Sequence, residues 1–292
     1  MVPILLFLIG LAGLKIALPG LMSLMMLLLK RIGFNQSREH MMEPAVGKLT
    51  GGDYGIGRFP DTNEILEVFN SQVALAQDLK GQKILVTAGG TREAIDDVRY
   101  IGNRSSGKQG VAIALSAKAR GAEVTLIVAN VDTKNLVGIK VISVENTAQL
   151  RKELSIQFPL CQVLIMAAAV SDARPELSTG KVKKSEYKKI DLIENPDLLA
   201  ELSKIRTSQI MVGFAAEVSA NLLQEGERKL NSKGLDLIYA NDIDEGKIFG
   251  SDLTSGFIIS SKGYEEIHPI SKQSLAMRLL DKVVERLNSS NV

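Results

Sequence analysis

A long loop in the middle of the chain carries residues suited to binding a phosphate or carboxylate. The loop follows an apolar segment, starts with Gly89-Gly90-Thr91-Arg92 and ends with Ser105-Ser106-Gly107, where a helix is expected to begin. Free backbone N–H groups and the positive end of the macrodipole at a helix start favour an anion. Taken alone, however, Ser105 and Ser106 are more often helix caps than ligand contacts.

Lysines supply a second set of possible anion contacts. Lys229 and Lys233 stand four apart on a predicted helix and hence on one face, so they are either simply exposed or share an anion such as a triphosphate. Lys181 opens a stretch with five lysines up to residue 189, and such runs are usually solvated loops. Asp172 follows a buried strand, where a carboxylate can accept hydrogen bonds from a ribose or a base.

Short apolar runs alternate with amphipathic stretches from residue 80 onward. The predicted strands are 83–88, 123–129, 140–144, 163–168, 210–215, 235–240 and 256–260. The predicted helices are 107–120, 147–157, 196–205, 220–232 and 271–287. This alternation predicts an α/β fold with a Rossmann-like, mostly parallel sheet and helices on both faces. Ligands of such sheets bind beyond the carboxyl ends of the strands, which is where the loop residues and Asp172 fall.

The spacing of the first loop disfavours an ordinary dinucleotide site. A GxGxxG fingerprint lies directly between strand and helix, whereas about twenty residues intervene here. A non-catalytic Rossmann-like nucleotide-binding module stays open as an alternative. It would need an acidic residue at the end of the second strand, but Asp132 is displaced from that end.

Composition limits the remaining classes of protein. The 292 residues are 45% hydrophobic and 23% charged, which is typical of one large or two modest globular domains. A net charge of +2 does not suggest binding of nucleic acid through charge alone. A single cysteine, Cys161, excludes an internal disulfide framework, and two histidines leave little for a His-based metal site. A reducing, cytoplasmic setting fits best, with Cys161 as an inert packed residue.

The first 29 residues carry one charge, Lys15. A membrane span needs about 20 consecutive apolar residues, and this segment reaches that length only across Lys15, with Pro3 and Pro19 as further interruptions. No basic region follows Met1, so a signal peptide is disfavoured. We expect buried core elements here and regard membrane binding as the less favoured reading, although a membrane anchor stays open.

The string GGTREAIDDVRYIGNRSSGKQG closely resembles the signature of the phosphopantothenate-cysteine ligases. The resemblance covers residues 82 to 290. It recurs at AAAVSDARP (167–175), KVKK (181–184), NPDLL (195–199), GFAAE (213–217) and the Lys229 and Lys233 pair. It implies a ligase domain over residues 80–292 that joins 4'-phosphopantothenate to L-cysteine in coenzyme A biosynthesis. CTP with Mg²⁺ would activate the carboxylate, and the enzyme would be a homodimer whose site is completed by the neighbouring chain.

The resemblance also assigns roles to individual residues. Asn103, Arg99 and Lys181 would be catalytic. The nucleotide-binding residues would be Met166, Ala167, Ala168, Asp172, Lys181, Pro196, Asp197, Leu198, Leu199, Phe214, Lys229 and Lys233. The substrate or phosphate loop would be Gly89, Gly90, Thr91, Arg92, Ser105, Ser106 and Gly107. Without the resemblance, Phe214 is more typical of a core residue. Metal ligands stay unassigned.

A second resemblance lies in residues 1–79. The segment GGDYGIGRFP is similar to the C-terminal flap of the flavin-dependent phosphopantothenoylcysteine decarboxylases, with Gly51 in place of the catalytic cysteine. Met22 stands where that family has an asparagine. A glycine has no thiol and a methionine lacks the amide's hydrogen bonds. We therefore expect a truncated, inactive decarboxylase remnant and linker without FMN, the alternative being a bifunctional enzyme that retains decarboxylase activity.

Overall fold

The chain divides into two units, Met1–Leu75 and Ala76–Val292. The computed structural model describes residues 45–48, 54–58, 77–133, 136–176, 189–217, 221–242 and 252–289. In the first unit, β1 (Ala45–Lys48) pairs antiparallel with β2 (Tyr54–Arg58). The apolar first 29 residues, Met22 and Gly51 lie outside the described residues. Within the described ranges, no helix is both long and apolar enough to cross a membrane.

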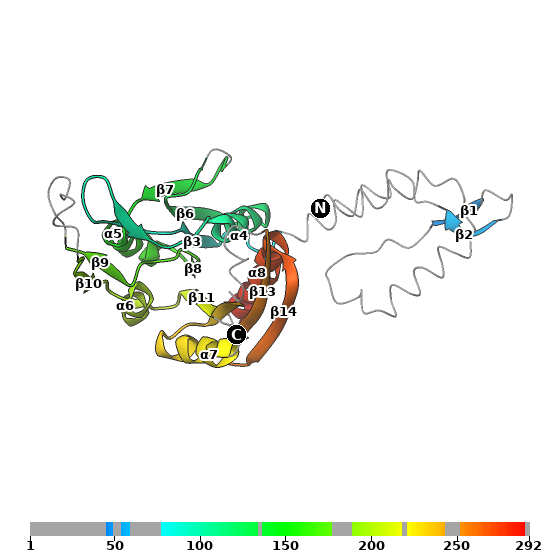
Figure 1. Cartoon of the computed structure of the whole chain (residues 1–292). Helices are drawn as coiled ribbons and strands as arrows, with labels where there is room; N and C mark the ends of the chain where they lie inside the picture. The colour runs from blue at the N-terminus through cyan, green and yellow to red at the C-terminus, as the bar shows by residue number, and fades with distance from the viewer. Residues whose placement is uncertain are drawn as a thin grey trace. The chain divides into compact units, whose positions relative to one another are not determined.

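An eight-stranded sheet organises the second unit (Figure 1) in the order β14-β13-β12-β11-β8-β3-β6-β7. The strands from β7 to β12 run parallel to one another, whereas β13 and β14 are antiparallel additions at one edge. Their bounds are β3 Lys83–Gly89, β6 Glu123–Ala129, β7 Lys140–Val144, β8 Val163–Met166, β11 Ile210–Glu217, β12 Leu237–Asp242, β13 Leu253–Ser260 and β14 Gly263–Ser271. The predicted α/β class with a mostly parallel sheet is confirmed.

Helices cover both faces of this sheet because each central strand is apolar on both sides. In β3, Ile84 and Val86 belong to one buried cluster, which also holds residues of α4 (Lys108–Ala119) and α8 (Lys272–Ser289). Leu85 points to the other cluster, with residues of α5 (Thr147–Gln157), α6 (Leu198–Ile205) and α7 (Leu222–Ser232). A short 3-10 turn, η2 (Phe158–Leu160), follows α5.

Several predicted element bounds are wrong by a few residues. The strand expected at 163–168 ends at Met166, and the backbone N–H of Ala168 donates to Thr87 Oγ1 (3.0 Å) instead of extending the ladder. The helix expected from Pro196 begins at Leu198. The strand expected at 256–260 starts at Leu253, the one expected at 235–240 spans Leu237–Asp242, and β14 was not predicted.

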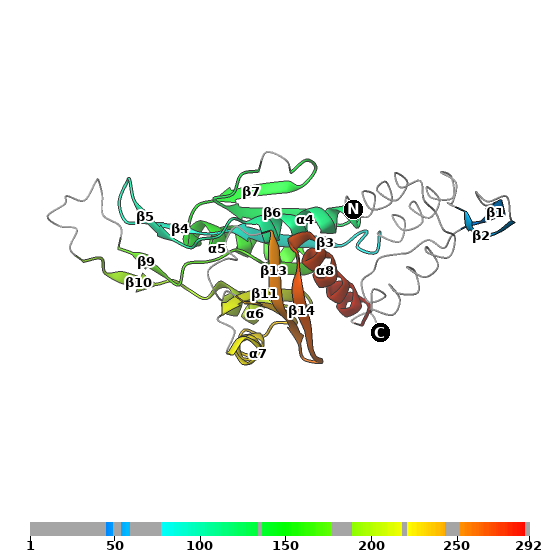
Figure 2. The ribbon, with the colours of Figure 1, turned by 45° about the vertical axis from the view of Figure 1, so that its right-hand side comes forward.

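Two small antiparallel sheets extend away from the main sheet (Figure 2). One pairs β4 (Arg92–Ala94) with β5 (Tyr100–Gly102), and the other pairs β9 (Ala173–Pro175) with β10 (Leu192–Glu194). They are built from the loops that follow β3 and β8. The fold therefore extends the two loops that carry most of the predicted site residues.

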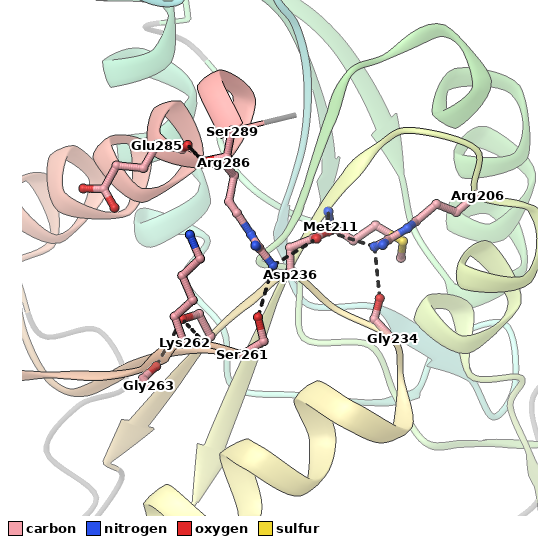
Figure 3. Close-up of polar contacts among 11 residues, drawn as sticks. Arg206, Met211, Gly234, Asp236, Ser261, Lys262, Gly263, Glu285, Arg286 and Ser289 are labelled. Carbon is pink, nitrogen blue, oxygen red and sulfur yellow. Dashed lines mark hydrogen bonds and ion pairs between the residues drawn. The ribbon is translucent and has the colours of Figure 1, made fainter. Parts of the chain in front are cut away.

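At the amino end of β12, Asp236 ties several elements together (Figure 3). Its Oδ2 accepts hydrogen bonds from Arg206 Nη1 (2.8 Å) and from the backbone N–H of Met211 (2.9 Å). Its Oδ1 lies 3.5 Å from Arg286 Nη2, on the C-terminal helix. This one carboxylate thus links the end of α6, the start of β11 and the end of α8. It lies at the amino ends of the parallel strands, opposite their carboxyl ends.

Candidate functional site

The order of the strands places the topological switch point of the sheet between β3 and β8. From β3 the chain moves to β6 and β7 on one side, and then returns to β8 and β11 on the other side. Such a switch point is where open α/β sheets bind ligands, because the loops leaving the two strands diverge there. The two strands stay together as far as a bridge between Gly90 and Ala169, with Thr91 N donating to Ala169 O (3.1 Å).

Glycines allow the start of α4 to approach the end of β3 closely. Gly89 has φ +91°, and a Cβ there would overlap the carbonyl oxygen of Ala129. Gly107 has φ +73°, and a Cβ there would collide with the side chain of Val131 and lie 3.2 Å from Gly89 N. Positive φ and this lack of space both require glycine. The backbone N–H groups of the α4 start therefore lie beside the switch point.

The serines before α4 do not cap it. Gly107 is the N-cap residue and no side chain caps the helix, so the reading of Ser105 and Ser106 as helix caps is wrong. No acidic residue occupies the first turn of α4 either. The helix start accordingly keeps the properties that favour an anion.

Asn103 connects the first loop to the second. Its Nδ2 donates to the carbonyl oxygen of Val170 (3.1 Å), and its side chain is otherwise exposed. Its own carbonyl oxygen lies 3.0 Å from the position a Cβ would take on Gly90. Asn103 is therefore at the switch point. Arg99 lies in the turn of the β4–β5 hairpin, where it contacts Asp96, and Arg92 stacks on Tyr100 of the same hairpin with Cζ 4.7 Å from the ring centroid.

A buried polar network holds the loops at the switch point in place. Thr147, at the start of α5, donates its hydroxyl to Glu93 Oε1 (2.7 Å) and lies 3.3 Å from Thr91 Oγ1. Thr91 Oγ1 accepts from the backbone N–H of Ser171 (3.0 Å). Asn195 Nδ2 donates to Ser171 O (2.9 Å). All five residues are less than one-tenth exposed, so the network fixes the loops from beneath.

The same network positions Asp172. The backbone N–H of Asn195 donates to the carbonyl oxygen of Asp172 (2.8 Å), and Asn195 Oδ1 accepts from Arg174 Nη1 (3.0 Å). The Asp172 side chain itself is exposed. Its carboxylate thus stands on a fixed backbone immediately before β9 and is exposed to solvent.

The start of α6 brings a carboxylate and a lysine together. Asp197 caps the helix, with Oδ1 accepting the backbone N–H of Ala200 (3.1 Å), and its Oδ2 lies 3.1 Å from Lys233 Nζ. Lys229 precedes Lys233 by one turn of α7, and both are half-buried. Pro196 is half-buried, whereas Leu198 and Leu199 are buried in the core. The two leucines therefore anchor the helix whose start carries Asp197.

Four of the residues assigned to nucleotide binding lie in or directly after β8 and in β11. Met166 is buried, and its sulfur accepts a hydrogen bond from Thr87 Oγ1 (3.5 Å), while Ala167 and Ala168 are half-buried. Phe214 is half-buried and packs edge-to-face on Tyr239, with ring centroids 5.7 Å apart. The register pairs Val212 with Ile165, so Phe214 stands two residues further along, near the carboxyl end of β8.

Residues 79–287 match the family described as the DNA/pantothenate metabolism flavoprotein C-terminal domain. The match covers well over half of the chain. The chain belongs to this family. The predicted kinship of the second unit is thereby confirmed, whereas nothing tests the decarboxylase resemblance of residues 1–79.

Relatives and solved structures agree with the family. The chain is 42% identical over 264 residues to the "Coenzyme A biosynthesis bifunctional protein CoaBC" of Mycobacterium bovis, an alignment that covers 84% of this chain and 63% of that protein. It thus spans less than two thirds of that relative. A crystal structure of a C-terminal domain of CoaBC superposes with a TM-score of 0.63 at 30% identity, covering 73% of this chain and 99% of that one. A family member from Streptococcus pneumoniae gives 0.61 at 25%, covering 70% and 98%.

One predicted site residue lies outside the residues that the structure describes, and three residues that hold the site together were not predicted from the sequence. Lys181 falls outside the described residues. Glu93, Thr147 and Asn195 were not predicted, although Asn195 stands in the quoted NPDLL segment. Where the second strand ends, Asn130 Nδ2 donates to the carbonyl oxygens of Gly90 and Glu145 (both 2.9 Å). That position therefore holds loops together in place of the acidic residue typical of dinucleotide sites.

Cys161 is buried and lies just before β8, away from the carboxyl ends of the strands. Burial raises the pKa of its thiol to about 12, and the thiol lies 3.3 Å from the carbonyl oxygen of Phe158. A thiol with so high a pKa is protonated at neutral pH and is a poor nucleophile. In the described part of the chain, no group of three or more His, Cys, Asp or Glu side chains could hold a metal ion.

Proposed function

We propose that this chain is a phosphopantothenate-cysteine ligase of coenzyme A biosynthesis. One observation carries the proposal. Segments that are far apart in the sequence and resemble separate ligase motifs meet at the switch point, where Asn103 donates to Val170 O (3.1 Å) and Asn195 holds the backbone of Asp172 (2.8 Å). The names of the relatives, coenzyme A biosynthesis bifunctional proteins, support the same pathway.

The proposed reaction has two steps. A carboxylate oxygen of 4'-phosphopantothenate attacks the α-phosphorus of CTP, forming the acyl-cytidylate as pyrophosphate leaves. The amine of L-cysteine then attacks the acyl carbon, an amide bond forms, a proton is lost from the nitrogen, and CMP leaves. Both steps bring anions together, so the site must stabilise negative charge. The start of α4 supplies positive potential, and so does Lys233 at the end of α7, whose ammonium lies 3.1 Å from Asp197 at the start of α6. We assign Lys181 to the same task.

The residues present fit a magnesium ion that arrives with the nucleotide. Mg²⁺ keeps several waters and binds through one or two carboxylates together with substrate phosphates, so it needs no dedicated cage of side chains. Asp172 offers an exposed carboxylate immediately before β9, beside the buried network. Asp172 would hold the ion, which when bound would neutralise triphosphate charge. No flavin step is assigned to this unit.

We also propose a homodimer. The two small sheets and the β4–β5 turn expose apolar side chains: Val98 in the turn and Tyr100 in β5 are 64% and 51% exposed, and Leu192 and Ile193 in β10 are 54% and 44% exposed. Adjacent exposed apolar residues on projecting strands are typical of an interaction surface. Light scattering of the purified protein should give twice the chain mass, and a monomer at working concentration would contradict the proposal.

Incubation with phosphopantothenate, cysteine and either CTP or ATP tests the function directly. Pyrophosphate release and formation of phosphopantothenoylcysteine should depend on all three substrates and be faster with CTP. If no pyrophosphate is released with CTP or with ATP, the ligase assignment is refuted. A preference for ATP would refute the choice of nucleotide.

The Asn103→Asp variant tests the role assigned to this amide. An amide can donate to the developing oxyanion of the second step, whereas a carboxylate repels it. We expect product formation to fall about 100-fold, and more than pyrophosphate release falls, so that the acyl-cytidylate accumulates. Equal loss of the two steps would contradict this role. Asn231→Asp, on the exposed face of α7, is the control.

A further inference from the structure

A buried carboxylate, Asp96, contacts Arg99 in two separate ways at the turn of the β4–β5 hairpin. Asp96 Oδ1 accepts the backbone N–H groups of Val98 (2.9 Å) and Arg99 (2.8 Å). Asp96 Oδ2 accepts Arg99 Nε (3.1 Å) and also pairs with Arg99 Nη2. One carboxylate group therefore fixes both the backbone and the guanidinium of Arg99.

Burial makes this arrangement rigid. The Asp96 side chain has no exposed surface, and a buried carboxylate that lost its cationic partner would be strongly destabilised. The backbone N–H groups of Ile95 and Asp96 donate to the carbonyl oxygen of Arg99 (2.8 and 3.3 Å), which closes the turn from the other side. The Arg99 side chain nevertheless keeps 33% of its surface exposed. The turn thus presents a guanidinium to solvent in one orientation.

We propose that Asp96 is a positioning residue of the ligase reaction that acts through Arg99, an inference that rests on the proposed function. A guanidinium recognises phosphate and carboxylate groups through its planar set of N–H donors, so its orientation decides which anions it can bind. Holding that orientation before the substrate arrives removes the cost of ordering a long side chain during the reaction. Asp96 performs this task without contacting substrate.

The variant Asp96→Asn separates the two contacts of Asp96 in the full chain. Asparagine keeps a carbonyl oxygen for the backbone N–H groups of Val98 and Arg99 but loses the negative charge that holds the guanidinium. We expect kcat/KM for amide formation to fall about 10- to 100-fold, with the thermal unfolding midpoint lowered by only a few degrees. Asp97→Asn is the matched control, because Asp97 is the next residue and is exposed. Its activity should stay within about twofold of the wild type.

A double variant decides whether Asp96 acts through Arg99. In an Arg99→Gln background there is no guanidinium to position, so adding Asp96→Asn should cost less than about twofold in further activity, measured at a temperature at which both proteins are folded. If the two losses instead multiply, Asp96 has an independent role and the proposal is overturned. Asp96→Glu keeps a carboxylate, so its kcat/KM should exceed that of Asp96→Asn by at least about threefold. An Asp96→Glu protein no more active than Asp96→Asn would contradict the need for a carboxylate.

Labelling with phenylglyoxal reads the positioning without any turnover. Mass spectrometry of the Arg99 peptide should show at least about threefold faster modification in Asp96→Asn than in the wild type, because the guanidinium is released. Arg151, which is 57% exposed in its side chain, serves as the internal reference. An unchanged rate at Arg99 would overturn the proposal. If the wild type releases no pyrophosphate, the ligase function fails, and the labelling still shows separately whether Asp96 holds Arg99.

Discussion

Asn195 connects three loops of the candidate site from a buried position. Its Nδ2 donates to Ser171 O (2.9 Å) and lies 3.4 Å from Thr147 Oγ1, and its Oδ1 accepts from Arg174 (3.0 Å). We predict that Asn195→Leu lowers the free energy of unfolding by about 2–4 kcal/mol, because it leaves buried partners without hydrogen bonds. Urea unfolding measures this. Asn231→Leu, at an exposed position of α7, should change stability by less than about 0.5 kcal/mol.

Because of Cys161, the stability of the fold should depend on pH in the alkaline range. The ordinary pKa of 9.0 for its thiol is raised to about 12 by burial, so between these values the unfolded thiol ionises while the folded one stays protonated. The resulting stabilisation is complete below about pH 9 and is lost as the pH rises toward 12. From pH 8 to pH 10.5 we predict a loss of about 1–2 kcal/mol in the wild type beyond that in Cys161→Ala. Equal pH dependence of the two proteins would contradict this.

At the scale of single residues, the sequence could predict which loops follow the carboxyl ends of the strands but not how these loops are held. Asp96 and Asp97 are adjacent aspartates in a polar loop, and nothing in their spacing distinguishes the buried one from the exposed one. Glu93 and Thr147 are 54 positions apart and meet only because β4, which follows β3, and the start of α5 lie at the same end of the sheet. Contacts of this kind depend on tertiary structure, which local patterns do not contain.

At the scale of elements, the central strands and the helices could be predicted because their apolar residues recur with clear periods. The strands 123–129 and 140–144 and the helix 147–157 have the predicted bounds. The strand β14 (Gly263–Ser271) escaped because its sequence, GYEEIHPIS, is mostly polar and contains a proline, as suits an edge strand. The small sheets escaped because strands of three residues have too little periodicity to detect.

The packing of α4 on β3 depends on Gly110. A Cβ at this position would lie 2.6 Å from both Ala88 Cβ and Thr87 O, so the helix would have to move away from the sheet. We predict that Gly110→Ala lowers stability by about 1–3 kcal/mol, even though alanine is the better helix former. It should also slow pyrophosphate release, because the start of α4 lies beside Gly89. Leu115→Ala, at a 40% exposed position of the same helix, is the control, and a more stable Gly110→Ala protein would contradict the close packing.

At the scale of the whole molecule, the candidate ligand site of the second unit is separate from the charged networks that join its helices and strands. The loops of the candidate site leave the carboxyl ends of the strands, whereas two networks of charged residues lie at the opposite end of the sheet. One is the Asp236 network, and the other surrounds Arg120, whose guanidinium is buried at the end of α4. Burial acts to lower the pKa of Arg120, but hydrogen bonds and attraction from Asp78 and Asp281 outweigh it and raise the pKa. Arg120 therefore stays charged and joins α8 to the start of the unit.

The start of the second unit should consequently be essential for its stability. Leu79 is fully buried and its N–H donates to Arg120 O (3.1 Å), while Asp78 pairs with the Arg120 side chain (2.8 Å to Nε). We predict that the fragment 76–292 folds and unfolds cooperatively without residues 1–75. A fragment starting at residue 82 should be less stable by about 4 kcal/mol or more, because it leaves Arg120 with one carboxylate fewer and opens a cavity where Leu79 packed.

Urea unfolding of the two fragments and of the full chain measures this difference, and pyrophosphate release shows whether the candidate site survives in the shorter chains. The double variant Asp78→Asn, Leu79→Ala in the fragment 76–292 is the matched control, since it removes the same contacts without shortening the chain. It should reproduce most of the loss seen on starting at residue 82. Asp78 and Leu79 both contact Arg120. Equal stability of the two fragments would show that these contacts do not stabilise the unit, and would contradict the prediction.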